Sequence, residues 1–190
     1  LIALMEGVED IPGTALHEGI RWAWESFPEY LDALDRNAYT MDVGAQVPHG
    51  ALRGYVMGDR GAQHTENPSA EEIARMGSLV AESVRAGALG FSTSRTVNHR
   101  SSDGRHTPSL SAGFDELVGI ARAMGATGQG VFEVVCDWVD MDPEFALLRA
   151  MVEASGRPIS ITTLQNPARP QQYQRLLELI ESAVADGVPM

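Results

Sequence analysis

Apolar residues follow two different spacings along the chain, and each spacing predicts one type of secondary structure. Short continuous apolar runs, typical of strands buried on both faces, occur at residues 41–47, 88–91, 130–136 and 158–164. Between these runs, apolar residues recur every three or four positions, as they do on one face of an amphipathic helix. The pattern therefore predicts four strands that alternate with helices.

The residues at the ends of the predicted helices support this pattern. Capping-box pairs occur at Ser26–Glu29 and Ser69–Glu72, directly before helical apolar stripes. Asp142 precedes Pro143 in the order that is favoured at a helix start. Gly87 directly follows one of these stripes, where glycine is the favoured residue for ending a helix.

Alternation of strands and helices predicts an α/β fold in which right-handed crossovers join parallel strands. Two architectures fit: part of a (β/α)8 TIM barrel, with helices on one side of the sheet, and an open doubly wound sheet, with helices on both sides. A whole barrel needs about 250 residues, so 190 residues would form an incomplete one. Because the chain opens within an apolar segment and closes directly after a helical stripe, we expect residues 1–190 to be an internal segment, incomplete at both ends.

Composition excludes several classes of function. The net charge of −12 argues against a nucleic-acid or membrane partner, because both need a positive surface. All 14 basic residues are arginines, so the chain has no lysine for a Schiff base, a phosphate-binding P-loop or a carbamylated metal bridge. Cys136 is the only cysteine and no apolar run approaches the ~20 residues needed to cross a bilayer, so we expect a cytoplasmic protein.

Polar side chains follow the predicted strands, at the sheet edge where α/β folds place their reactive groups. His49 follows the first strand next to Gly50, and it would either contact a ligand or be hydrogen-bonded into the strand–loop corner. Arg53 would bind a carboxylate or pair with an acidic neighbour. The loop at residues 95–108 is long, polar and rich in arginine and histidine, which suits an anionic substrate group or a solvated insertion. The predicted substrate-binding residues are His49, Arg53, Ser92, Ser94, Arg95, His99 and Arg100.

Several sequence blocks resemble the middle of the N-acyl-D-amino-acid deacylases (D-aminoacylases) of the amidohydrolase superfamily. They are WESFPEYLDAL at 24–34, VGAQVPHGALR at 43–53, VMG at 56–58 and GALGFSTS at 87–94. The order and spacing of these blocks match the family. The resemblance is clear from about residue 22 to residue 95 and looser beyond.

This resemblance implies a (β/α)8 barrel and the zinc-assisted hydrolysis of an amide by water. The sequence departs from the family at two expected metal-binding histidines, because Val135 occupies one position and residues 161–165 contain none. We therefore assign no metal ligand and no catalytic residue within this chain. Zinc is implied by the resemblance alone.

Two functions follow from these observations. The first is a hydrolase of carbon–nitrogen bonds other than peptide bonds, which cleaves the linear amide of an N-acyl amino acid and is inactive as this segment alone. The second is a metal-free relative that binds a small anionic ligand without hydrolysis, and the missing histidines favour it. In both cases we expect a small-molecule partner that carries a carboxylate, and we leave self-association open.

Overall fold

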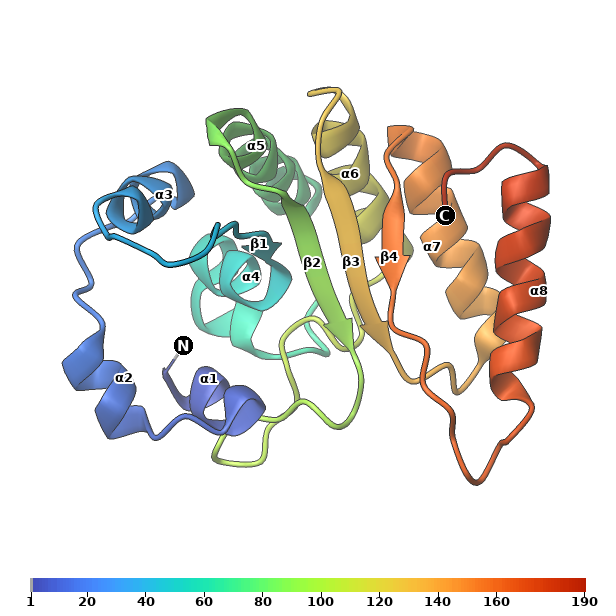
Figure 1. Cartoon of the computed structure of the whole chain (residues 1–190), viewed down its shortest axis with the longest axis horizontal. Helices are drawn as coiled ribbons and strands as arrows, with labels where there is room; N and C mark the ends of the chain where they lie inside the picture. Colours follow the sequence, from blue (N-terminus) through green and yellow to red (C-terminus); the bar gives the residue numbers. More distant parts are fainter. Residues whose placement is uncertain (1) are drawn as a thin grey trace.

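A computed structural model describes residues 2–190 and contains one parallel four-stranded sheet (Figure 1). The strands lie side by side in the order of the sequence, without a reversal. Sequential order is the arrangement of a barrel wall, whereas a doubly wound sheet reverses its strand order part-way. The strands are β1 (Val47–Pro48), β2 (Gly90–Arg95), β3 (Val131–Cys136) and β4 (Ile159–Ile161).

Helices cover one face of this sheet. Figure 1 shows α5, α6 and α7 side by side behind the strands, and α5 and α7 both pack against the central α6. The helices are α1 (Ile2–Glu9), α2 (Gly13–Gly19), α3 (Phe27–Asp35), α4 (His49–Met57), α5 (Ala70–Ala86), α6 (Phe114–Gly125), α7 (Met141–Ser155) and α8 (Gln172–Ala185), with a 3-10 turn η1 (Gly58–Ala62). One-sided cover confirms the barrel-type α/β arrangement.

Both predicted capping boxes are confirmed. The Ser26 hydroxyl accepts the Glu29 amide at 3.3 Å, and the Glu29 carboxylate accepts the Ser26 amide at 2.9 Å. The same two hydrogen bonds join Ser69 and Glu72 at the start of α5. Gly87 ends α5 with φ +119°, a left-handed conformation that glycine adopts without strain.

Other predicted boundaries are wrong by a few residues. Of the strand predicted at 41–47, only Val47 pairs with β2, and Pro48 directly after it extends the pairing. Residues 41–44 are exposed, and the Ala45 carbonyl accepts the Leu89 amide at 2.8 Å. The strand predicted at 88–91 runs instead from Gly90 to Arg95, and the one predicted at 158–164 shortens to Ile159–Ile161. The helix expected to begin at Asp142 begins one residue earlier, so Pro143 lies within its first turn.

The two faces of the sheet differ in chemistry. Phe91, Phe132 and Ile159 are in register on the helix-covered face and are buried. Ser92, Glu133 and Ser160 are in register one residue later, so they lie on the opposite face. Because side chains alternate between the faces, the apolar core lies between sheet and helices. The helix-free face carries this polar row, with Val131 and Val135 before and after Glu133 on β3.

Candidate functional site

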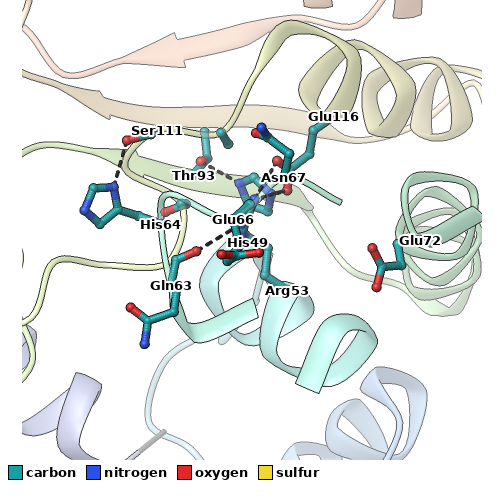
Figure 2. A network of polar contacts seen from close by, with 12 residues as sticks. His49, Arg53, Gln63, His64, Glu66, Asn67, Glu72, Thr93, Ser111 and Glu116 are labelled. Carbon is teal, nitrogen blue, oxygen red and sulfur yellow. Dashed lines mark hydrogen bonds and ion pairs between the residues drawn. The ribbon is translucent and has the colours of Figure 1, made fainter. Parts of the chain in front are cut away.

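A buried polar network surrounds His49 at the start of α4. Its ring joins Thr93 of β2 through Nδ1 at 2.9 Å and Glu116 of α6 through Nε2 at 3.0 Å (Figure 2). Nη1 of Arg53 donates to both oxygens of Glu116 at 2.6 Å. All four residues are at most 5% exposed, so the network lies within the protein and connects α4, β2 and α6.

The partners of His49 define its protonation state. An ionised Glu116 accepts hydrogen bonds but donates none, so His49 Nε2 carries the proton and Nδ1 accepts the Thr93 hydroxyl. Burial lowers the pKa of His49 despite the opposing attraction of Glu116. Burial alone would raise the pKa of Glu116, but its hydrogen bonds and charge interactions with His49 and Arg53 outweigh burial and lower it. The network therefore holds a neutral histidine between a hydroxyl and an arginine-paired carboxylate.

His49 and Arg53 thus have the structural roles that the sequence left open for them. His49 is hydrogen-bonded into the strand–loop corner, and Arg53 pairs with an acidic neighbour. In addition, Nη2 of Arg53 donates to the backbone carbonyls of Gln63 and Glu66. Neither side chain has a surface to offer a substrate in this structure, because both are 1% exposed.

Arg95 lies at the end of β2 and is held by α7. Its guanidinium pairs with Glu144 through Nε and through Nη2, the latter at 3.1 Å, and Nη1 donates to the Ala112 carbonyl at 2.7 Å. The positive charge of Arg95 is therefore already neutralised by a carboxylate.

The loop after β2 is organised by its own contacts. The Ser94 hydroxyl and His99 Nδ1 form a hydrogen bond of 2.8 Å, which connects the loop to the end of β2. Arg100 is exposed and donates to the carbonyls of Val97 and Gly104, each at 3.1 Å. Asp137, directly after β3, accepts the Thr96 hydroxyl and, at 2.8 Å, the Val97 amide. Asp137 is therefore an anchor for this loop.

A cavity of about 710 Å³ opens where β2 and β3 end, between the first turns of α6 and α7. Most of its wall is apolar. Arg95 and Glu144 are paired with each other, Asp137 is hydrogen-bonded to the loop, and Asp140 adds an exposed carboxylate. Cavities of this size accommodate small molecules. Its apolar lining includes Leu110, Phe114, Cys136, Trp138, Val139 and Leu147.

The helix-free face supplies a further set of polar groups. Glu133 occupies the middle of β3, is exposed, and lies level with Ser92 on one side and Ser160 on the other. Ser94 lies on the same face, nearer the strand ends. Of the predicted substrate-binding residues, Ser92 and Ser94 share this face, His99 and Arg100 lie on the adjoining loop, and the other three contact helices.

The side chains present do not fit a metal site. Across residues 2–190, no group of three or more histidine, cysteine, aspartate or glutamate side chains lies close enough to hold a metal ion. Burial raises the pKa of the Cys136 thiol to about 12, and both Asp137 oxygens already accept hydrogen bonds. Cys136 is thus a protonated thiol and is not poised as a ligand or a nucleophile.

Two acidic residues at important positions in the structure were not among the residues predicted from the sequence. Glu116 completes the His49 network. The sequence feature that indicates it is a charged residue beside the buried apolar stripe of Leu117, Ile120 and Met124. Glu144 pairs with Arg95 across 49 positions, and no local pattern indicates that pairing.

The sequence of this chain is similar to known proteins. The model of the amidohydrolase family matches residues 1–188. The chain belongs to the amidohydrolase family. It is 32% identical to a D-aminoacylase of Alcaligenes xylosoxydans xylosoxydans over 117 residues, which cover 62% of this chain and 22% of that protein. It is also 33% identical over 92 residues to uncharacterized proteins of Mycobacterium tuberculosis and Mycobacterium bovis, covering 47% of this chain and 15% of each.

The D-aminoacylase resemblance seen in the sequence is therefore confirmed. The chain spans about a fifth of the length of this relative. No solved structure matches the chain significantly. Amidohydrolase membership implies a TIM-barrel-like fold, which agrees with four parallel strands in sequential order. In such a barrel the helix-free face points toward the axis, so Ser92, Ser94 and Glu133 line the interior.

None of the helices between residues 2 and 190 combines the length and the apolar character that crossing a membrane requires.

Proposed function

We propose that the protein hydrolyses the amide bond of an N-acyl amino acid, a carbon–nitrogen bond other than a peptide bond. The observation that carries the proposal is the amidohydrolase match over residues 1–188, on a sheet whose helix-free face carries Ser92, Glu133 and Ser160 in register. Similarity to a D-aminoacylase favours an N-acyl amino acid as the substrate class. A small-molecule substrate also suits the acidic composition, which disfavours nucleic acids and anionic membranes.

The residues of this chain would form one part of the wall of the reaction site. Water is the nucleophile in the proposed reaction: it adds to the amide carbonyl, the carbon–nitrogen bond breaks, and the amine leaves with a proton. Arg100 is the arginine that suits the substrate carboxylate, since it is exposed and its Nη2 makes no hydrogen bond within residues 2–190. Arg95 is less suited, because Glu144 already neutralises it.

Metal dependence is the part of the proposal that rests on the resemblance alone. When bound, zinc would activate the attacking water. The described residues do not bring a ligand set together, so we derive no step through a metal. We further propose a cytoplasmic location, because the single cysteine is reduced and buried.

Hydrolysis is tested with the full-length protein and a panel of N-acetyl amino acids of both stereochemistries. We expect free amino acid to be released, measured by amine-reactive fluorescence, with zinc, cobalt or manganese supplied in parallel reactions. Absence of amine release from every panel member and with every metal would overturn the proposal.

The missing histidines favour the metal-free binder as the second candidate. The same panel is therefore also titrated against the protein by calorimetry. Saturable binding of an N-acetyl amino acid without amine release, by a protein that purifies without zinc, would establish this second function in place of the first.

A further inference from the structure

Glu133 is a charged side chain at the centre of the helix-free face. It is exposed in β3, with Ser92 of β2 and Ser160 of β4 in register on its two sides. Within residues 2–190 its carboxylate has no hydrogen-bond or ion-pair partner. The face therefore presents a row of a hydroxyl, a carboxylate and a hydroxyl across three adjacent strands.

Such a row is unusual for the inside of a barrel. Bulky branched side chains normally fill the interior of a barrel in layers, and Val131 and Val135 supply such side chains on this face of β3, before and after Glu133. A carboxylate that is removed from water without a partner is strongly unfavourable. The Ser92–Glu133–Ser160 row therefore indicates that this level of the interior holds polar contents rather than packed apolar side chains.

We infer that this row binds the cationic end of a substrate side chain, so that the protein acts on N-acyl derivatives of basic amino acids. This inference rests on the proposed function. An ionised carboxylate only accepts hydrogen bonds, and both serine hydroxyls accept them as well. An ammonium or guanidinium group only donates, so the row and a lysine or arginine side chain are complementary in hydrogen bonding and in charge.

The depth of Glu133 in the sheet fits this assignment. It lies three residues before the end of β3 at Cys136, which corresponds to about 10 Å along the strand at about 3.3 Å per residue. Barrel enzymes carry out their chemistry at the strand ends, where Arg100 lies on the loop after β2. A substrate whose amide and carboxylate lie at the strand ends would direct a long basic side chain downward to Glu133. An acidic side chain would be repelled there.

The experiment compares substrates that differ only in the charge of their side chain. The full-length protein is assayed with the N-acetyl derivatives of lysine, arginine, glutamine and glutamate. We expect kcat/KM for the two basic substrates to exceed that for the glutamate derivative by about tenfold or more. In Glu133→Gln this ratio should fall to near one, while the glutamine derivative changes by less than about threefold. Glu82→Gln, which removes an exposed charge on α5, should keep the wild-type ratio.

A second measurement keeps this inference separate from the proposed hydrolysis. Butylguanidine and butyrate are titrated against wild type and Glu133→Gln by calorimetry, without any reaction. Butylguanidine should bind to wild type and lose about tenfold or more in affinity in Glu133→Gln, whereas the affinity for butyrate should be the same in the two proteins. Hydrolysis with an unchanged basic-to-acidic ratio in Glu133→Gln would overturn this inference alone. Failure of hydrolysis together with Glu133-dependent butylguanidine binding would overturn the proposed function and the action on N-acyl substrates, and would support cation binding by the row.

Discussion

Glu116 is the residue on which the His49 network depends. It accepts hydrogen bonds from both His49 and Arg53, so it links α6 to α4 and, through His49, to Thr93 of β2. A buried ion pair gives little net stability compared with apolar packing, but removing one member leaves the other charge buried and unpaired. Arg53 would be that unpaired charge, because it is 1% exposed and Glu116 is its carboxylate partner.

We expect Glu116→Ala to lower the free energy of unfolding by about 3–5 kcal/mol, the usual cost of breaking a buried pair from one side. Urea denaturation at neutral pH measures the change. Glu153→Ala is the matched control, because Glu153 pairs with Arg149 on the exposed side of α7 and should contribute less than about 1 kcal/mol. Equal effects of the two substitutions would contradict a special role for Glu116.

The neutral state of His49 predicts a dependence of stability on pH. Burial lowers the pKa of His49 in the folded protein, while the unfolded chain titrates near the ordinary value of about 6.5. As pH falls below about 6.5, the unfolded state therefore takes up a proton that the folded state resists, and the free energy of unfolding decreases. The lowered pKa of Glu116 has its effect below about pH 4.5, so the window from pH 5 to 7.5 separates the effect of His49 from that of Glu116.

Urea denaturation across this window is compared in wild type, His49→Gln and His17→Asn. Burial also lowers the pKa of His106, which adds an effect of the same sign in all three proteins. We expect His49→Gln to reduce the slope of stability against pH, and His17→Asn, which removes an exposed imidazole from α2, is the control substitution. A slope that is the same in wild type and His49→Gln would show that His49 is not held neutral.

At the scale of the element, α4 shows why a helix escaped detection in the sequence. The segment from His49 to Met57 contains Gly50 and Gly54, and Gly58 follows it directly, so its helix propensity is low. Its contacts with β2 and α6 through His49 and Arg53 stabilise the helix despite this composition. By contrast, the capping boxes of α3 and α5 act over three residues, and the sequence predicted them correctly.

Gly54→Ala tests this explanation. A Cβ at Gly54 meets no atom within 4 Å, so alanine should stabilise the protein by about 0.5–1 kcal/mol through helix propensity alone. Gly77→Ala in α5 is the matched comparison, because its Cβ would lie 2.8 Å from the Cβ of Ala123 in α6. We expect that substitution to give no gain or a loss in thermal denaturation. A gain at Gly77 equal to that at Gly54 would contradict the close packing of α5 on α6.

Strand boundaries were less predictable than helix starts for a related reason. The apolar run at residues 41–47 has strand character, but most of it finds no neighbour to pair with, and only Val47 and Pro48 align with β2. The length of a strand depends on its partner, which lies more than 40 positions away here. A capping box contains both partners within one turn.

At the scale of the whole molecule, the sequence left open whether helices cover one or both faces of the sheet. Strand order decides between the barrel wall and the doubly wound sheet, and it is a property of long-range pairing that local periodicity does not contain. The candidate site likewise depends on long-range strand pairing. Ser92 and Ser94 were identified from their position near a strand end, but the alignment of Glu133 with Ser92 and Ser160 required the register.

Trp138 is an intrinsic fluorescence probe at the edge of the sheet. Its backbone has a φ of +56°, and the residue is 5% exposed beside the cavity between α6 and α7. Its indole nitrogen donates a hydrogen bond of 3.3 Å to the carbonyl of Thr162, which directly follows β4. Trp22 is 44% exposed and Trp24 lies beside it, so both belong to a separate aromatic cluster near α3. With those two replaced by phenylalanine, Trp138 is the one indole left within residues 2–190, and its emission would follow the filling of the cavity in real time and without an added dye.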